Sequence, residues 1–393
     1  MGTAPEPGEA RSREADSPSL RLGIYIHLPF CATKCNYCDF VTAPFDKALA
    51  DRYLSALERE INEAGLDGRF PVVDSVYFGG GTPSLTPGRA IDAILNALSR
   101  RLSVDSAAEI SLEMNPSAAE SDRAADYRSA GVNRLSIGVQ SFNDRELTSM
   151  TRAHTASEAV RAVCHAAECG YESISVDLML GLPGQTAQSF GRTLRQTVSL
   201  PLGHISVYML ELHKGTTLHG SVLSRDVRLP SEDFVARQYR RLVALLEGCH
   251  FAQYEISNFA RQGFASRHNL KYWTRQPYLG FGVGSHSFDG ASRWRNTRSL
   301  PRYLQEIESG RSPRDETTAV GEADALRERL FLGLRLREGI PQVLIEEWAR
   351  RNPQMQSRWD SFQQQGWVER YNDCYRLTVE GYLLSTSILG ELM

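Results

Sequence analysis

The stretch GIYIHLPFCATKCNYCDF, residues 23–40, joins a strand-like apolar run to three closely spaced cysteines, Cys31, Cys35 and Cys38. Spacings of four and three residues allow one loop to direct three thiolates at one soft metal centre. A closed four-cysteine site would draw a second pair of cysteines from elsewhere, but the remaining four are scattered along the chain. The motif therefore predicts a metal centre with one coordination position open to a substrate.

Two other interpretations of these cysteines are a structural zinc ion, with His27 or Asp39 as its fourth ligand, and a disulfide with one spare thiol. The composition is that of an ordinary soluble protein, with 41% hydrophobic residues, 23% charged residues and a net charge of -3. No apolar run is long enough to span a bilayer, and residues 1–20 lack the apolar core of a signal peptide. We therefore expect a cytoplasmic protein, and the absence of a basic excess excludes nucleic acid as an expected partner.

From residue 21 onward, short apolar runs alternate with longer amphipathic segments, which is typical of βα units around a parallel sheet. We expect six strands, near residues 22–27, 73–78, 108–114, 133–138, 172–180 and 203–210. We expect the helices at residues 46–65, 88–101, 120–130, 156–169 and 186–198. Six such units predict an α/β fold, an open, partial (β/α)6 barrel with its active residues where the strands end.

Four regions are expected along the chain. We expect residues 1–20 to form a disordered tail and residues 21–215 to form the barrel. We expect residues 216–320 to form a connecting region, which is aromatic and glycine-rich at first and becomes polar and rich in turns from residue 291. Residues 321–393 show three helical runs and a hairpin, which predict a winged-helix-like α+β domain. Its third helical run, QSRWDSFQQQ, is not basic, so a lid or docking role is favoured over DNA binding.

The CxxxCxxC pattern of Cys31, Cys35 and Cys38 resembles that of the radical S-adenosylmethionine (SAM) enzymes. In that superfamily the three cysteines hold three irons of a [4Fe-4S] cluster, and the fourth iron chelates the methionine end of SAM. The resemblance implies a [4Fe-4S] cluster and SAM as cofactors, a partial barrel, and an electron donor such as a flavodoxin or ferredoxin. It implies no protein side chain as a catalytic residue, because the reductive cleavage of SAM belongs to the cofactors.

The same resemblance assigns residues to SAM. Gly80, Gly81 and Thr82 form the glycine loop after the second strand, where the backbone can approach a ligand closely. The other assigned residues lie at or near strand ends or in the MTRAHT segment: Tyr25, Glu113, Gln140, Arg152, Asp177 and Leu210. Judged from the residues alone, each acid within an apolar strand must be paired or liganded, and a buried salt bridge is the plain alternative.

Longer runs, among them YIHLPFC, YFGGGTPSL, SIGVQSFND and YEISNFA, resemble the oxygen-independent coproporphyrinogen III oxidases and their relatives, the HemW haem chaperones. The oxidases carry a fourth cysteine two residues after the third, where this chain has Phe40. The resemblance therefore implies a haem chaperone that delivers haem to an acceptor apo-protein, with a homodimer as one possible state. The alternative is an oxidase that converts two propionates of coproporphyrinogen to vinyl groups.

The run His268-Asn269-Leu270-Lys271-Tyr272 is an HNxxY motif, which in the chaperone branch is associated with haem binding. Neutral imidazole is a common axial ligand of haem iron, so the resemblance assigns His268, Asn269 and Tyr272 to haem. On the residues alone, a loop histidine packed among aromatic side chains is the plain alternative. His286 is a second candidate, and the arginines between residues 293 and 302 could meet haem propionates.

Overall fold

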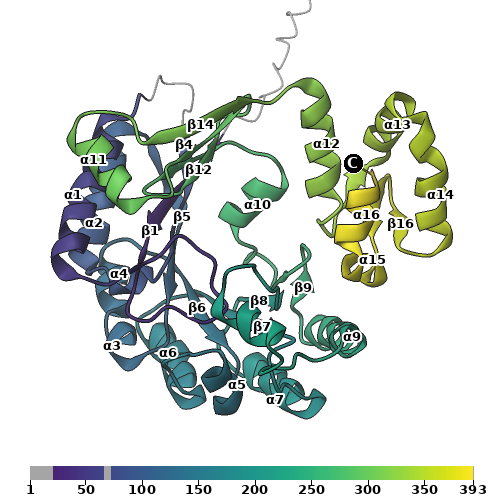
Figure 1. Cartoon of the computed structure of the whole chain (residues 1–393), viewed down its shortest axis with the longest axis horizontal. Helices are drawn as coiled ribbons and strands as arrows, with labels where there is room; N and C mark the ends of the chain where they lie inside the picture. Colours follow the sequence, from purple (N-terminus) through teal and green to yellow (C-terminus); the bar gives the residue numbers. More distant parts are fainter. Residues whose placement is uncertain (1–20, 66–71, 393) are drawn as a thin grey trace, which may run out of the picture.

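The computed structural model describes residues 21–65 and 72–392, so the predicted tail at residues 1–20 lies outside the described part. The six predicted strands are confirmed as β1 (Arg21–Leu28), β4 (Val72–Gly80), β5 (Val104–Met114), β6 (Arg134–Gln140), β7 (Ser173–Leu180) and β8 (His204–Met209). They are neighbours in this order and each pair is parallel. The partial (β/α)6 barrel is therefore confirmed (Figure 1).

The helices that cover the barrel mostly begin and end as predicted. They are α1 (Lys47–Glu63), α2 (Gly88–Arg101), α6 (Ala156–Glu168), α7 (Ala187–Val198) and α9 (Glu232–Gly248). The single helix predicted at residues 120–130 is wrong, because the chain forms α3 (Ala118–Ser121) and α4 (Ala124–Ser129) instead. Between them the Arg123 guanidinium donates to the carbonyls of Ser84 and Leu85, both at 3.0 Å, which favours a turn over a continuous helix.

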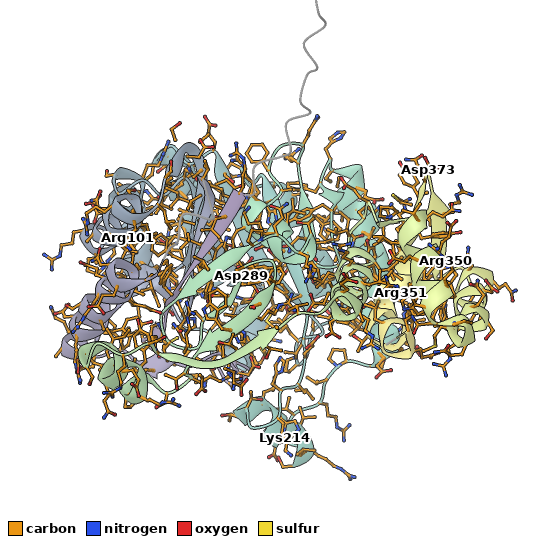
Figure 2. The ribbon with its side chains drawn as sticks, turned by 90° about the horizontal axis from the view of Figure 1, so that it is seen from above. Arg101, Lys214, Asp289, Arg350, Arg351 and Asp373 are labelled. Carbon is orange, nitrogen blue, oxygen red and sulfur yellow. The ribbon has the colours of Figure 1, made fainter. Side chains whose placement is uncertain are left out.

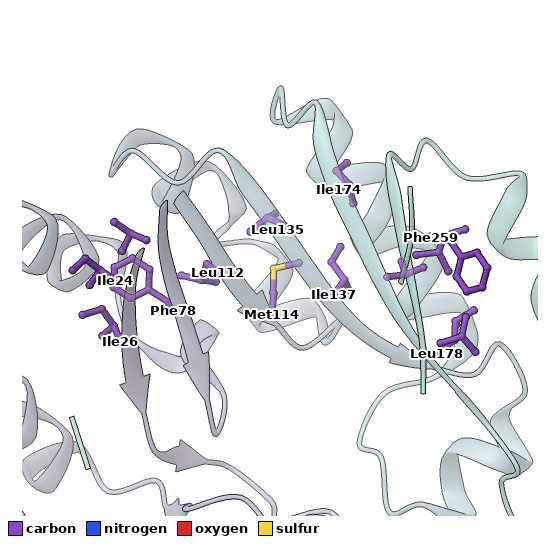
Figure 3. Close-up of a cluster of buried hydrophobic side chains, with 14 of the residues drawn as sticks. Ile24, Ile26, Phe78, Leu112, Met114, Leu135, Ile137, Ile174, Leu178 and Phe259 are labelled. Atoms are coloured by element: carbon purple, nitrogen blue, oxygen red, sulfur yellow. The ribbon is translucent and has the colours of Figure 1, made fainter. Parts of the chain in front are cut away.

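The two faces of the barrel sheet differ in polarity. Side chains that point outward to the helices are buried and apolar, as Figure 3 shows for Ile24, Phe78, Leu112, Ile137 and Leu178. The alternate positions point inward and are largely polar or aromatic: Tyr25, His27, Ser75, Tyr77, Glu113, Ser136, Ser175, Asp177 and Ser206. A parallel sheet buried on both faces is usually apolar throughout, so this polar inner face indicates a ligand site within the barrel.

The region expected to be connecting, residues 216–320, also extends the sheet to twelve strands. At one edge β11 (Tyr278–Phe281) runs parallel to β1, followed by the antiparallel β12 (His286–Phe288), β13 (Ser292–Asn296) and β14 (Arg314–Ala319). At the other edge lie β10 (Asn258–Ala260) and β9 (Ala252–Gln253). No strand was predicted at residues 314–319, because all six side chains of β14 are exposed and show no apolar alternation.

The C-terminal part has the three predicted helices and the hairpin, with two further helices after the hairpin that were not predicted, and it stands beside the barrel (Figure 1). Its helices are α12 (Glu322–Gly333), α13 (Gln342–Arg351), α14 (Gln356–Gln364), α15 (Val379–Leu383) and α16 (Ser385–Leu392). Its small sheet has the order β15 (Ile340–Pro341), β17 (Cys374–Leu377), β16 (Val368–Tyr371). The winged-helix-like architecture is confirmed, while the exact domain boundaries stay a prediction.

The remaining elements are short. They are β2 (Phe30–Cys31), β3 (Ala43–Pro44), the 3-10 turns Pro83–Leu85 and Pro353–Met355, α5 (Asp144–Ser149), α8 (Thr217–Leu223), α10 (Arg267–Trp273) and α11 (Leu300–Glu308). Lys214 lies on a segment that projects from the body of the protein (Figure 2). Within the described residues, no helix has both the length and the apolar character needed to cross a membrane.

Candidate functional site

A pocket of about 550 Å³ opens where the barrel strands end. The loop with Cys31, Cys35 and Cys38 forms one wall, and the glycine loop after β4 forms the next. The carboxyl ends of β5 to β8 contribute the floor, and residues of α15 and α16 contribute a further wall. This is the position at which barrel folds place their active residues.

Two of the three cysteines are held at the pocket by side-chain hydrogen bonds to their sulfur atoms. The Thr82 hydroxyl donates to Cys31 Sγ at 3.5 Å, and Arg152 Nη1 donates to Cys35 Sγ at 3.3 Å. Burial raises the pKa of the Cys31 and Cys38 thiols. Among the described residues, no three His, Cys, Asp or Glu side chains converge tightly enough to hold one metal ion. Three thiolates that line one pocket are soft donors, and they would leave one position of a cluster without a protein ligand.

The alternatives for the cysteine motif find little support in its surroundings. The ring nitrogens of His27 lie 3.0 Å from the Tyr25 hydroxyl and 2.8 Å from the Val41 carbonyl oxygen, so neither is free for zinc. Asp39 faces His213, with 3.4 Å between Oδ2 and Nδ1. All seven cysteines are free thiols, so the motif holds no disulfide.

Arg152 is a buried cation beside the loop that carries Cys31, Cys35 and Cys38, which we call the cluster loop. Its Nη2 donates to Asn115 Oδ1 and to the Gly138 carbonyl, both at 2.7 Å. Its Nε is buried and finds no hydrogen-bond acceptor in the part of the chain that the structure describes. Since an unpaired buried donor is costly, this atom fits a site completed by an acceptor group of a bound molecule, such as the carboxylate of SAM.

Two carboxylates face the pocket from the inner side of the sheet. Glu113 accepts from the Tyr77 hydroxyl at 2.9 Å and from the Gly80 amide at 3.1 Å. Burial, followed by the charge of Asp177, raises the pKa of Glu113 to about 7. Asp177 accepts from Ser136 Oγ at 3.2 Å, and burial also raises its pKa. Two buried carboxylates with raised pKa values at one site indicate a ligand that supplies positive charge and hydrogen-bond donors.

Most residues that the resemblance assigns to SAM line this pocket, namely Gly80, Gly81, Thr82, Glu113, Gln140, Arg152, Asp177 and Leu210. Gln140 adopts a left-handed backbone with φ of 65°, which is uncommon for a non-glycine residue and is often found at functional sites. Tyr25 is the exception, because it does not line the pocket and its hydroxyl contacts His27. Tyr77 lines the pocket instead, and its place two residues before Gly79 on the same strand face was the signal that could have found it.

Sequence reasoning also missed the part of the wall that comes from the end of the chain. The pocket residues there are Tyr382, Leu383, Ser385 and Thr386, on α15 and α16. A bidentate ion pair holds α15 to α9, with Arg240 Nε and Nη2 donating to Glu380 at 2.5 and 2.6 Å. The lid or docking role expected for this region stays a prediction, and nothing in the sequence pointed to these particular residues.

The HNxxY motif lies at the start of α10, so the plain alternative of a loop histidine is wrong about the loop, although His268 does pack among aromatic side chains. His268 is only 1% exposed, and its ring nitrogens lie 3.0 Å from Ser75 Oγ and 2.8 Å from the Tyr272 hydroxyl. Burial, with Lys271 as the second cause, lowers the pKa of His268 to about 3. The ring is therefore neutral but has no nitrogen free, so the assignment of His268, Asn269 and Tyr272 to haem stays a prediction that requires the motif to rearrange.

His286, the second haem candidate, is exposed on β12 and lies opposite Arg295 of β13. Burial and the charges of Arg295, Arg298 and Arg293 lower its pKa, which favours neutral imidazole. Three of the four arginines considered for propionates have carboxylate partners instead: Arg293 with Glu328, Arg295 with Glu316, and Arg302 with Asp315. Within residues 21–65 and 72–392, only Arg298 of the four lacks such a partner.

Family models match two parts of the chain, the radical SAM superfamily at residues 25–197 and the HemN C-terminal domain at residues 321–384. The heme chaperone HemW of Bacillus subtilis is 33% identical over 94% of this chain and 98% of its own length. HemW of Escherichia coli is 35% identical over 94% and 97%. The mitochondrial radical S-adenosyl methionine domain-containing protein 1 of Mus musculus is 34% identical over 88% and 79%.

Among solved structures, the coproporphyrinogen III oxidase HemN of Escherichia coli, described as a radical SAM enzyme, is similar to this chain with a TM-score of 0.82. The sequence identity is 25%, and the match covers 96% of this chain and 91% of the oxidase. The likeness therefore includes both the barrel and the C-terminal part.

Proposed function

Because the chain belongs to the family of HemW-like radical SAM proteins, we propose that it is a haem chaperone that binds a [4Fe-4S] cluster, SAM and haem and passes the haem to an acceptor apo-protein. The observation that carries the proposal is the near-full-length similarity to HemW proteins together with Phe40, which is 64% exposed at the pocket where the related oxidases place a fourth cysteine. Radical SAM membership by itself implies the cluster and SAM.

In this proposal Cys31, Cys35 and Cys38 hold the cluster, and the remaining residues of the pocket bind SAM. When bound, the two groups supply an electron and a cleavable sulfonium, which is the chemistry of the cofactors. The chain itself orients the ligand: Glu113 and Asp177 accept its donors, and Arg152 offers the free Nε to its carboxylate. Leu210 and Met179 of the pocket wall exclude water from the apolar part of the ligand.

The Asp177 carboxylate gives a direct test of SAM binding. In Asp177→Ala we expect SAM affinity to fall about tenfold or more, because a buried acceptor is lost and its donors stay unpaired at a cost of roughly 1–3 kcal/mol. Anaerobic titration calorimetry on the reconstituted protein measures this. Asp92→Ala, an exposed aspartate of α2, is the control and should bind SAM as the wild type does. Unchanged affinity in Asp177→Ala would remove this residue from the SAM site.

Haem requires an accessible axial ligand, and His286 offers one on the structure as it stands. Its imidazole is exposed and favoured in the neutral form, and Arg298 is near enough to affect its pKa and can meet a propionate. The other large cavity, of about 690 Å³ between α1, α11 and β11 to β14, has no His, Cys or Met among the described residues that line it. We therefore place haem at the β12–β13 surface, with His286 as the axial ligand.

The chaperone and the oxidase are separated by one pair of assays. We expect the reconstituted protein to bind haem with a defined Soret spectrum, and to leave coproporphyrinogen unchanged in an anaerobic assay with SAM and reductant. His286→Ala should weaken haem binding about tenfold, a typical loss for one ligand contact, and His250→Ala, another exposed histidine, should not. The iron-sulfur absorption should stay the same in both variants, because the two sites share no ligand.

Two results would change this proposal in different ways. Decarboxylated porphyrinogen in the anaerobic assay would replace the chaperone with the oxidase. Haem binding that is lost in His268→Ala and kept in His286→Ala would retain the chaperone but return the haem site to the HNxxY motif.

A further inference from the structure

We propose that His268, whose ring is held by Tyr272, is a positioning residue for the SAM pocket. It holds Tyr77 and Tyr25, which in turn fix the glycine loop and the end of the loop that carries Cys31, Cys35 and Cys38. The inference rests on the proposed SAM site and concerns a motif that this site does not include. It follows from two chains of contacts that both begin at the His268 ring.

The first chain leads from His268 to the glycine loop. The His268 ring stacks on Tyr77 with 5.3 Å between centroids and 23° between planes. The Tyr77 hydroxyl donates to Glu113, and the Glu113 carboxylate accepts the amide of Gly80. The position of the imidazole therefore sets the position of a carboxylate of the pocket through one tyrosine ring.

The second chain leads from His268 to the cluster loop. The His268 and Tyr25 rings lie at 29°, with 6.5 Å between centroids, and Tyr25 also stacks on Tyr77. The Tyr25 hydroxyl lies 3.0 Å from His27 Nδ1, and His27 Nε2 lies 2.8 Å from the carbonyl oxygen of Val41, shortly after Cys38. Tyr25 thus links the motif to the far end of the cysteine loop without itself reaching the pocket.

The His268 ring is itself fixed from several directions, as a positioning group must be. Ser75 and Tyr272 occupy its two nitrogens, and Glu109 of β5 accepts its backbone amide at 3.1 Å. One turn further, the ammonium of Lys271 is buried and pairs with Asp74 at 2.7 Å. Helix α10 is therefore anchored to the inside of the barrel by buried polar contacts, which leave it little freedom to shift.

A second histidine provides a matched control for a merely structural role. His204 of β8 is also 1% exposed, and its ring nitrogens lie 2.7 Å from Ser175 Oγ and 2.8 Å from the Tyr254 hydroxyl. Its two ring nitrogens have the same kinds of partner as those of His268, but among the described residues the aromatic ring beside it is that of Tyr254, which does not line the pocket. Replacing either histidine with Ala breaks an equivalent pair of contacts, but only His268→Ala disturbs the chain to Glu113.

The readout is the pH dependence of SAM binding. Burial, followed by the charge of Asp177, raises the pKa of Glu113 to about 7, while the hydrogen bond from Tyr77 opposes this rise. The titratable groups that face Glu113 are Tyr77, Asp177, Tyr25, Tyr272 and Tyr208. The ionised carboxylate is the form that accepts donors from SAM, so affinity should increase as the pH rises through about 7. If Tyr77 is displaced, its hydrogen bond no longer lowers the pKa of Glu113. The pH at which SAM affinity reaches half of its increase, the midpoint, should then be higher.

The experiment compares SAM titrations of the full-length, reconstituted protein from about pH 6 to pH 9, a range that spans the Glu113 transition. We expect the midpoint to move upward by about half a pH unit or more in His268→Ala and in Tyr77→Phe, which keeps the ring and removes only the hydroxyl. His268→Gln, which can still make a hydrogen bond, should restore part of the wild-type profile. His204→Ala should lose thermal stability but keep the wild-type midpoint.

Equal profiles in His268→Ala and His204→Ala would overturn the inference, and so would a wild-type profile in Tyr77→Phe if His268→Ala does not fold. Loss of haem with an unchanged SAM profile in His268→Ala would also overturn it, in favour of a haem ligand. A wild-type protein that binds no SAM at any pH would overturn the proposed SAM site and this inference together, whereas wild-type SAM binding without haem binding would overturn the chaperone alone.

Discussion

Replacing Cys35 with Ala is expected to remove most of the iron and sulfide that the protein takes up on anaerobic reconstitution. In the proposed site Cys35 is one of three protein ligands, so its loss would leave a cluster with two cysteines and two open irons, and Arg152 would lose the sulfur to which its Nη1 donates. Iron and sulfide analysis, together with the absorption of the cluster, measures the loss. Cys31→Ala and Cys38→Ala should behave in the same way.

The chain offers matched controls for this result. Cys164, Cys169, Cys249 and Cys374 are also free thiols, and none of them lines the pocket. Cys164→Ala and Cys249→Ala should therefore keep the wild-type content of iron and sulfide. Full iron retention in Cys35→Ala would show that the cluster is held elsewhere.

Replacing Gly81 with Ala is expected to damage the cluster site and the SAM site together. A Cβ atom at this position would lie 2.6 Å from the Pro29 carbonyl oxygen and 2.8 Å from that of Phe30, both of which are backbone atoms that cannot turn aside. The glycine loop must therefore move away from the strand that leads into Cys31. We expect a loss of roughly 1–3 kcal/mol in the free energy of unfolding, which is usual for overpacking, and at least about tenfold weaker SAM binding.

Thermal unfolding and SAM titration of the reconstituted Gly81→Ala protein measure both effects. Gly248→Ala is the matched control, because it lies at the end of α9 and its Cβ would meet no atom within 4 Å. That variant should be as stable as the wild type or slightly more stable, since Ala favours helix over Gly. Wild-type SAM affinity in Gly81→Ala would mean that the glycine loop and the backbone at Pro29 and Phe30 are not in close contact when the protein binds SAM.

The barrel could be predicted from the sequence because its strands are marked by apolar residues on the side that faces the helices. Leu22, Ile24 and Ile26 alternate with Gly23, Tyr25 and His27, and the same alternation recurs in the later strands. This reasoning does not find β13 and β14, because β14 exposes all six of its side chains and β13 half-buries four in a row, so neither alternates between buried and exposed residues. A strand without this alternation leaves little periodic signal in the sequence.

In the candidate site, too, some residues could be predicted from the sequence and others could not. The cysteine loop, the glycine loop and the strand-end carboxylates are local patterns, so they could be predicted and are found around one pocket. The environment of His268 could not be predicted, because Ser75, which contacts its ring, is 193 residues away in the chain. Likewise, the contribution of Tyr382 to the pocket depends on how the C-terminal helices pack beside α9.

The position of α15 and α16 at the pocket has a consequence for the order in which the protein is made. Cys31, Cys35 and Cys38 leave the ribosome long before the pocket residues from Tyr382 to Thr386. Domains generally fold as they emerge, so the barrel can form before this wall of the pocket is in place. Iron and sulfide can then reach the three cysteines of a nascent chain from the side that α15 and α16 later line.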